Sequence, residues 1–181
     1  AGPTFALTVE GGHSYRRHLQ AYVGSGASQT YLTIDRNSML AIAVNQSVVD
    51  DFTYNVGDVT GTIAVTGGTL NAFRIEANAT GAGETYSANM PNKLAPSVVL
   101  PMIATSSVQV RGYATVTPAG GSQVDVNLGV QTINLGAGGA TVAWNLDASA
   151  LALGSIGGTI ATTGPDLVDK HALAASRQSG T

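Results

Sequence analysis

The chain has 181 residues, enough for one domain with a hydrophobic core, and it contains no cysteine, which excludes disulfides and thiolate metal sites. Charged residues make up only 10% of the sequence and the formal net charge is −3, so we expect no overall attraction to nucleic acid or to an acidic membrane. No apolar run approaches the ~20 residues that a membrane-spanning helix needs.

Period-two alternation of apolar and polar residues recurs along most of the chain and predicts short β-strands. The N-terminal region, residues 1–22, is expected to be an arm that contains the first strand, at residues 5–9. The next strands are predicted at residues 29–34 and 39–44, and Gly, Asn and Ser between them indicate turns.

A basic segment in the arm is unusual in a chain so poor in charge; it consists of Tyr15, Arg16, Arg17 and His18. In a strand, Tyr15 and Arg17 share one face, and Arg16 and His18 share the other. One interpretation is a solvated segment that pairs with acids such as Asp50 and Asp51. The other is an anchor onto an acidic neighbouring surface or a phosphate, because guanidinium groups match both chemically.

Residues 60–77 are predicted to form a hairpin that turns at Gly67 and Gly68. Leu70 has the opposite parity from Phe73, which predicts one extra residue, a β-bulge, at Asn71 or Ala72. The following residues, 78–97, show no periodicity and many turn-forming residues, so we expect a long contact loop there.

The second half of the chain gives the clearest strand patterns. A strand is expected at residues 98–104, and residues 107–117 and 123–130 should form a hairpin around the Pro-Ala-Gly-Gly turn at 118–121. With a strand at 141–146, these segments supply the expected core residues, which are Val108, Val110, Val124, Val126, Leu128, Val142 and Trp144, and Val130 shares the apolar face of its strand.

These elements predict an all-β fold: one domain over residues 1–181, built as an antiparallel β-sandwich, of which a jelly roll is one form. A last strand is expected at residues 155–162. Gly164, Pro165 and Asp166 then resemble a helix start, which predicts a short C-terminal helix at residues 165–177.

No residue pattern predicts an enzyme. The Gly-Ser-Gly sequence at residues 24–26 lacks the G-x-S-x-G motif of a hydrolase. Glycoside hydrolysis needs two carboxylates, but no pattern selects a pair from Glu10, Glu76, Glu84 and the aspartates. We therefore expect no catalytic residues.

Metal and cofactor sites are not predicted either. His13 and His18 point apart in either a strand or a helix, and Asp50, Asp51 and Asp58 lack the spacing of an EF-hand loop. The only tryptophan, Trp144, alternates in phase with core residues, and no spacing groups the six tyrosines into a carbohydrate-binding platform.

Low charge, small side chains, a basic arm and a long loop are typical of a subunit that is buried against neighbours. We expect a structural assembly subunit, most specifically a phage-type capsid decoration or cement protein in a virion, which binds copies of itself and a capsid subunit. The alternatives are a carbohydrate- or receptor-binding module of a fibre or adhesin, and a pilus or surface-layer subunit, with an extracellular or cell-surface location.

The expected partner-binding residues are Tyr15, Arg16, Arg17 and His18. Because the two arginines lie outside the strongest core alternation, replacing both by alanine is expected to weaken attachment and to leave the fold intact.

Overall fold

The computed structural model describes residues 6–23, 29–81 and 83–151, and most of these lie in β-strands. The described strands are β1 (His13–Val23), β2 (Thr30–Ile42), β3 (Val56–Thr66), β4 (Gly68–Gly81), β5 (Glu84–Asn89), β6 (Ser97–Ile103), β7 (Val108–Pro118), β8 (Val124–Ile133) and β9 (Ala140–Asp147). A 3-10 turn, Ala148–Ala150, follows the last strand. Within the described ranges, no helix is long and apolar enough to cross a membrane.

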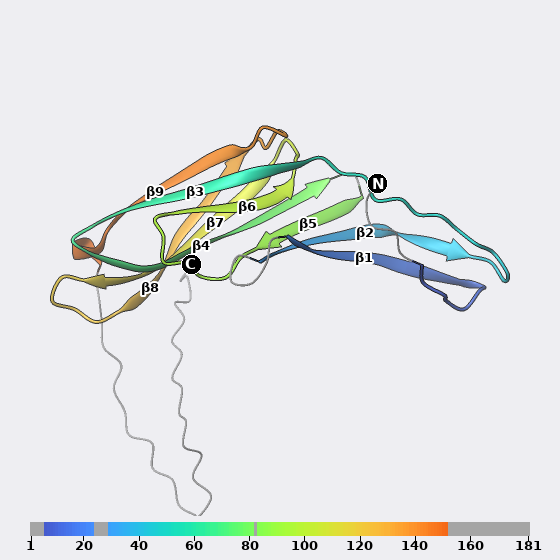
Figure 1. Cartoon of the computed structure of the whole chain (residues 1–181), viewed down its shortest axis with the longest axis horizontal. Helices are drawn as coiled ribbons and strands as arrows, with labels where there is room; N and C mark the ends of the chain where they lie inside the picture. Colours follow the sequence, from blue (N-terminus) through green and yellow to red (C-terminus); the bar gives the residue numbers. More distant parts are fainter. Residues whose placement is uncertain (1–5, 24–28, 82, 152–181) are drawn as a thin grey trace, which may run out of the picture. The chain divides into compact units, whose positions relative to one another are not determined.

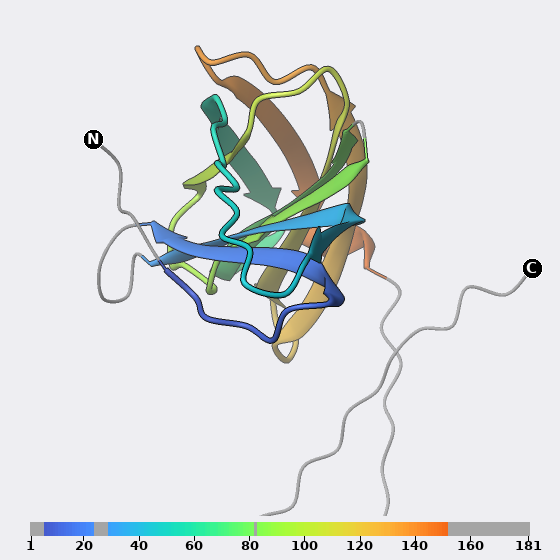
Figure 2. The same ribbon diagram turned by 90° about the vertical axis from the view of Figure 1, so that its right-hand side faces the viewer.

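The strands form two sheets that pack face to face. The larger sheet has the order β1-β2-β5-β4-β7-β8 and the smaller one has the order β6-β3-β9. Figures 1 and 2 show the smaller sheet over one face of the larger, where β3 and β6 contact β4 and β6 also contacts β5 and β2. The compact unit that contains this sandwich ends at Leu151. The expected strand at 155–162 and helix at 165–177 lie outside the described residues, and one domain over residues 1–181 stays a prediction.

The predicted all-β sandwich is confirmed, with one departure from a purely antiparallel arrangement. Among the described strands, every pair is antiparallel except β3 and β9, which run parallel. A jelly roll is built from antiparallel Greek keys, so this pair distinguishes the observed topology from that form of sandwich.

The predicted hairpin of β7 and β8 is confirmed, including its turn, in which the Gly121 amide donates to the Pro118 carbonyl at 3.0 Å. Val124, Val126 and Leu128 are half-buried against the core. Val130 is 47% exposed, so its predicted position on the apolar face was wrong. The register shifts here, and Gly129 has a left-handed backbone (φ 88°), which turns Val130 outward.

The bulge predicted in residues 60–77 is confirmed, but the hairpin is wrong. The register of β4 shifts between Leu70 and Ala72, which explains why Leu70 and Phe73 have opposite parity. The strand that pairs with β4 there is β7, and not β3 as the hairpin predicted. At Gly67 (φ 66°) the chain passes from β3 in the smaller sheet to β4 in the larger one. The same kind of turn sequence can therefore connect two strands of one hairpin or, as here, two strands in different sheets.

Most of the loop predicted at residues 78–97 is instead strand, since β4 continues to Gly81 and β5 covers Glu84–Asn89. The alternation is present, but its buried members include Ala77, Ala79 and Ala88, which are too small to stand out as an apolar pattern. Residues 6–9 form no strand, and Leu7 is 80% exposed. The strands predicted at 29–34 and 39–44 are parts of the single strand β2.

The core between the sheets centres on Phe73 and Trp144, whose rings meet edge to face at 5.9 Å. Phe73 is fully buried, and Trp144 is buried as predicted. The Trp144 ring packs directly on the backbone of Gly112, where a Cβ would lie 3.0 Å from the indole. Glycine at this position therefore allows the indole to approach β7.

Candidate functional site

The structure places the basic segment in β1, at the edge of the larger sheet. Arg17 lies opposite Arg36 of β2, and Arg16 occupies a register shift where it faces three residues of that strand, 37–39. Arg16 and His18 are exposed, whereas Arg17 is directed to the inner face of the sheet. The predicted alternation of these side chains is confirmed, and Arg16 and Arg17 therefore belong to two different environments.

On the inner face, Arg17 is bonded within its own chain. Its Nη1 donates to both carboxylate oxygens of Asp50 at 3.2 Å, and its Nη2 donates to the Ser38 carbonyl at 3.0 Å and to the Ser38 hydroxyl. The side chain is 17% exposed. This bears out, for Arg17, the interpretation that the basic segment pairs with acids such as Asp50. Replacement of Arg17 is therefore expected to affect the fold, contrary to the sequence-based expectation.

Arg36 is the centre of a larger ion network on the same face. Its Nε donates to Glu84 at 2.7 Å, its Nη1 pairs with Asp50, and its Nη2 donates to the Asp51 carbonyl at 2.9 Å. Its guanidinium also lies 4.0 Å from the centre of the Phe52 ring. Arg17, Arg36, Asp50 and Glu84, all 16–23% exposed, balance two positive and two negative charges.

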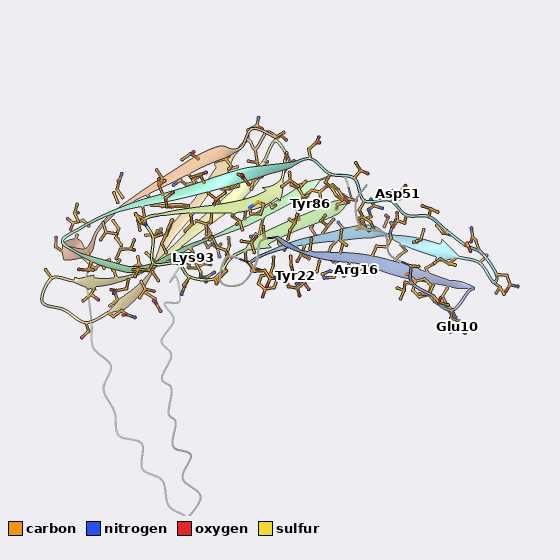
Figure 3. The ribbon with its side chains drawn as sticks, in the orientation of Figure 1. Glu10, Arg16, Tyr22, Asp51, Tyr86 and Lys93 are labelled. Carbon is orange, nitrogen blue, oxygen red and sulfur yellow. The ribbon has the colours of Figure 1, made fainter. Side chains whose placement is uncertain are left out.

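This network fastens residues 50–54 to the inner face of β1 and β2, beyond the part that the smaller sheet covers (Figure 1). Figure 3 shows Asp51 and Tyr86 on this side of the larger sheet and Arg16 and Tyr22 on the opposite side. From here on, the arm means this end of the sandwich, formed by the outer parts of β1 and β2 with residues 6–12 and 43–55. It is larger than the N-terminal arm of residues 1–22 that the sequence predicted. Its segments touch closely, because a Cβ on Gly11 would lie 2.6 Å from the Cα of Val44.

Glu84 accepts hydrogen bonds from two tyrosines, Tyr54 at 3.0 Å and Tyr86 at 2.7 Å. Burial alone would raise the pKa of Glu84, but these bonds and the bond from Arg36 outweigh burial and hold the pKa below its usual value. Burial, followed by the hydrogen bond to Glu84, raises the pKa of Tyr86 to about 12. A carboxylate held ionised by several donors stabilises structure, and it is not poised to donate or accept a proton.

The alkaline stability of the protein should depend on Tyr86. In the folded chain Tyr86 keeps its proton up to a pKa of about 12, whereas in the unfolded chain it loses it near pH 10. Between these values the unfolded state binds fewer protons, so the free energy of unfolding falls as pH rises, by about 3 kcal/mol once both states have lost the proton. Urea denaturation across this range should show the loss in the wild type and a smaller one in Tyr86→Phe. An unchanged slope in Tyr86→Phe would contradict the assignment, and Tyr22→Phe is the exposed control.

On the outer face, Arg16 and His18 both approach Asp35. The Nδ1 of His18 lies 2.8 Å from Asp35 Oδ1, and Arg16 Nη2 lies 3.9 Å from the same oxygen. The fourth predicted contact residue, Tyr15, donates from its hydroxyl to the carbonyl of Glu10. The structure thus does not gather the four predicted residues into one site, and of the four only Arg16 and His18 lie exposed beside a shared partner, Asp35.

The arm also carries apolar side chains that the sequence analysis did not select. Five of the ten large hydrophobic residues that are exposed in the described chain lie in it: Leu7, Met39, Val44, Val48 and Val49. Val49 is 85% exposed and Val44 is 70% exposed. We call these five residues the apolar tip. Exposed apolar residues mark an interaction surface where they form a contiguous patch, and Val44, Val48 and Val49 lie within six residues of one another in the chain.

The metal and paired-carboxylate chemistries gain no support from the geometry of the described residues. Asp50 is engaged by two arginines, and the described residues contain no group of three or more His, Asp or Glu placed to hold a metal. Glu76 pairs with Arg74 and accepts from Tyr113 at 3.2 Å, so it is a member of a separate surface cluster. Tyr22 and Tyr31 meet edge to face at 5.0 Å and 67°, so this pair exposes a single ring and does not form the coplanar platform of several rings that was considered from the sequence.

Comparison of the chain with models of known protein families, with curated proteins and with solved structures finds no match. The fold and the arm define a two-sheet β-sandwich with a braced, apolar-tipped extension.

Proposed function

We propose that the chain is a structural assembly subunit whose arm docks onto a neighbouring subunit, as in a capsid decoration or cement protein of a virion. The observation that carries this proposal is the apolar tip. Val44 and Val49 are mostly exposed, and Val49 directly precedes residues 50–54, which the ion network fixes to the sheet. Burial of apolar side chains contributes roughly 25 cal/mol per Å², which favours a partner that covers them.

The bracing of the arm supports docking. Association costs free energy when mobile segments must be ordered, and a segment already held in place avoids most of that cost. Residues 50–54 are held by Arg17 and Arg36 through the contacts of Asp50, Asp51 and Tyr54. The arm is thus presented as a preformed contact surface.

The outer face of the smaller sheet supports packing against further copies. Its exposed positions include Thr141, Ala143, Asn145 and Val99, all of which are uncharged, in a chain with only 10% charged residues. Small neutral side chains allow two sheets to approach closely with little desolvation of charge. On the larger sheet, the Arg16 guanidinium is exposed and lies 3.9 Å from Asp35, so it can also bond to a carboxylate of a neighbouring surface.

The experiment is analytical ultracentrifugation of the purified full chain over a range of concentrations. We expect concentration-dependent oligomers, and we expect the double variant Val44→Asp, Val49→Asp to associate at least about 100-fold more weakly, since two buried valines each contribute roughly 1.5–3 kcal/mol. Val130→Asp is the matched control, because Val130 is an exposed valine on β8 (47%), away from the arm. Association that survives in the double variant, or that is lost equally in the control, would contradict docking through the tip.

A further inference from the structure

A row of neutral polar side chains crosses the outer face of the larger sheet, opposite the core. Strand register aligns Gln20, Thr33, Ser87, Asn78, Gln109 and Thr132, one from each of its six strands. Neighbouring strands lie about 4.8 Å apart, so the row offers an amide or hydroxyl group at each such step. This spacing is close to the length of one pyranose residue in an oligosaccharide chain.

The middle of the row lies in a depression. Its volume is about 400 Å³, and its lining includes the side chains of Asn78, Thr80, Thr85, Ser87 and Gln109. Among the described residues, the side chains of Asn78, Ser87 and Gln109 have no hydrogen-bond partner. These amides and hydroxyls are therefore free to donate to and accept from a ligand, as sugar hydroxyls require.

An aromatic ring stands at one end of the row. Tyr22 is 55% exposed, it is supported edge to face by Tyr31, and its hydroxyl lies 3.4 Å from the side-chain oxygen of Gln20. The C–H face of a sugar ring packs on an aromatic ring of this kind. Tyr22 and Arg16 project from the same side of β1, away from the core (Figure 3).

The two carboxylates beside the depression are paired, and the nearby Arg111 donates to the Tyr113 hydroxyl at 3.5 Å. Asp35, which lines it, is engaged by His18 at 2.8 Å and by Arg16, and Glu76 is engaged by Arg74. A phosphate-rich ligand would require a run of free cations, and a protein partner would require apolar anchors. The lining consists mainly of hydroxyl and amide side chains, together with the paired carboxylate of Asp35 and the ring of Tyr86.

The geometry points to this face as a binding site for a neutral oligosaccharide, which lies across the strands along the row with one sugar on Tyr22. The site is independent of the apolar tip, because it lies on the outer face of the larger sheet and uses none of the tip residues. An assembled subunit with such a site would display a glycan-binding face on its particle.

The test is isothermal titration of the full chain with five neutral hexasaccharides: cellohexaose, maltohexaose, xylohexaose, mannohexaose and N-acetylchitohexaose. The anionic comparison is the hexamer of galacturonic acid. We expect at least one neutral chain to bind with a Kd on the order of 1 mM or below, and the anionic chain to bind more weakly.

Substitutions along the row then test whether the oligosaccharide binds there. Asn78→Ala and Gln109→Ala should each weaken binding about tenfold, because each removes hydrogen bonds to the sugar. Tyr22→Ala should weaken it at least as much, and Tyr22→Phe should retain it. Asn145→Ala is the matched control, an exposed asparagine on the other sheet that should leave binding unchanged. No binding of any neutral hexasaccharide, tighter binding of the anionic one, or equal affinity in Asn78→Ala and the wild type would overturn the proposal.

Discussion

Arg36→Ala is expected to lower the free energy of unfolding by about 3 kcal/mol, because it leaves partly buried carboxylates without their cation. Glu84 loses its only arginine, Asp50 keeps Arg17 alone, and the Phe52 ring loses the guanidinium stacked on it. The measurement is urea denaturation at neutral pH. Hydrogen exchange should also show faster exchange of the backbone amides in the outer parts of β1 and β2, which are paired with each other and carry the network.

Arg16→Ala is the matched control for this substitution. Arg16 is 65% exposed and its contact with Asp35 is 3.9 Å long, so its loss should change stability by no more than about 0.5 kcal/mol. A similar small loss for both variants would show that the ion network does not brace the arm. Arg16→Ala also becomes the suitable variant for testing attachment, because Arg17 is bonded inside its own chain.

Phe73→Ala should destabilise the sandwich by about 4 kcal/mol, the largest effect of a single substitution that we expect. Phe73 is fully buried between the sheets and supports Trp144 edge to face. Its removal loses apolar burial and leaves a cavity beside the indole. Thermal and urea unfolding check the value, and Val99→Ala, at a half-exposed position on the outer face of the smaller sheet, should change little. A loss below about 1.5 kcal/mol for Phe73→Ala would contradict the assignment of the core.

Local sequence patterns predicted several elements of the fold correctly. Alternation identified the hairpin of β7 and β8 and the burial of Trp144, and the change of parity between Leu70 and Phe73 located the bulge in β4. The partner of a strand is a longer-range property. The sequence around Gly67 favours a turn, but it does not show whether the next strand stays in the same sheet.

The candidate site was less predictable for the same reason. Arg36 of β2 contacts Glu84, which lies in β5, and Asp50, which lies in the segment before β3. No local sequence spacing links these three residues. The buried residues at the end of β4 and in β5 include alanines, so the alternation was not recognised and no strand was predicted after residue 77. The polar row on the outer face of these strands was missed for the same reason. A period-two pattern that includes alanine at residues 77, 79 and 88 is the signal that would have found them.

Electron cryo-microscopy of particles from cells that make the protein tests directly whether the chain is an assembly subunit. We expect the sandwich at regularly repeated positions of an ordered particle, with Val44 and Val49 of each arm buried against a neighbouring subunit. If no ordered particle contains the chain, and the purified protein stays monomeric at high concentration, the proposed assembly function is contradicted.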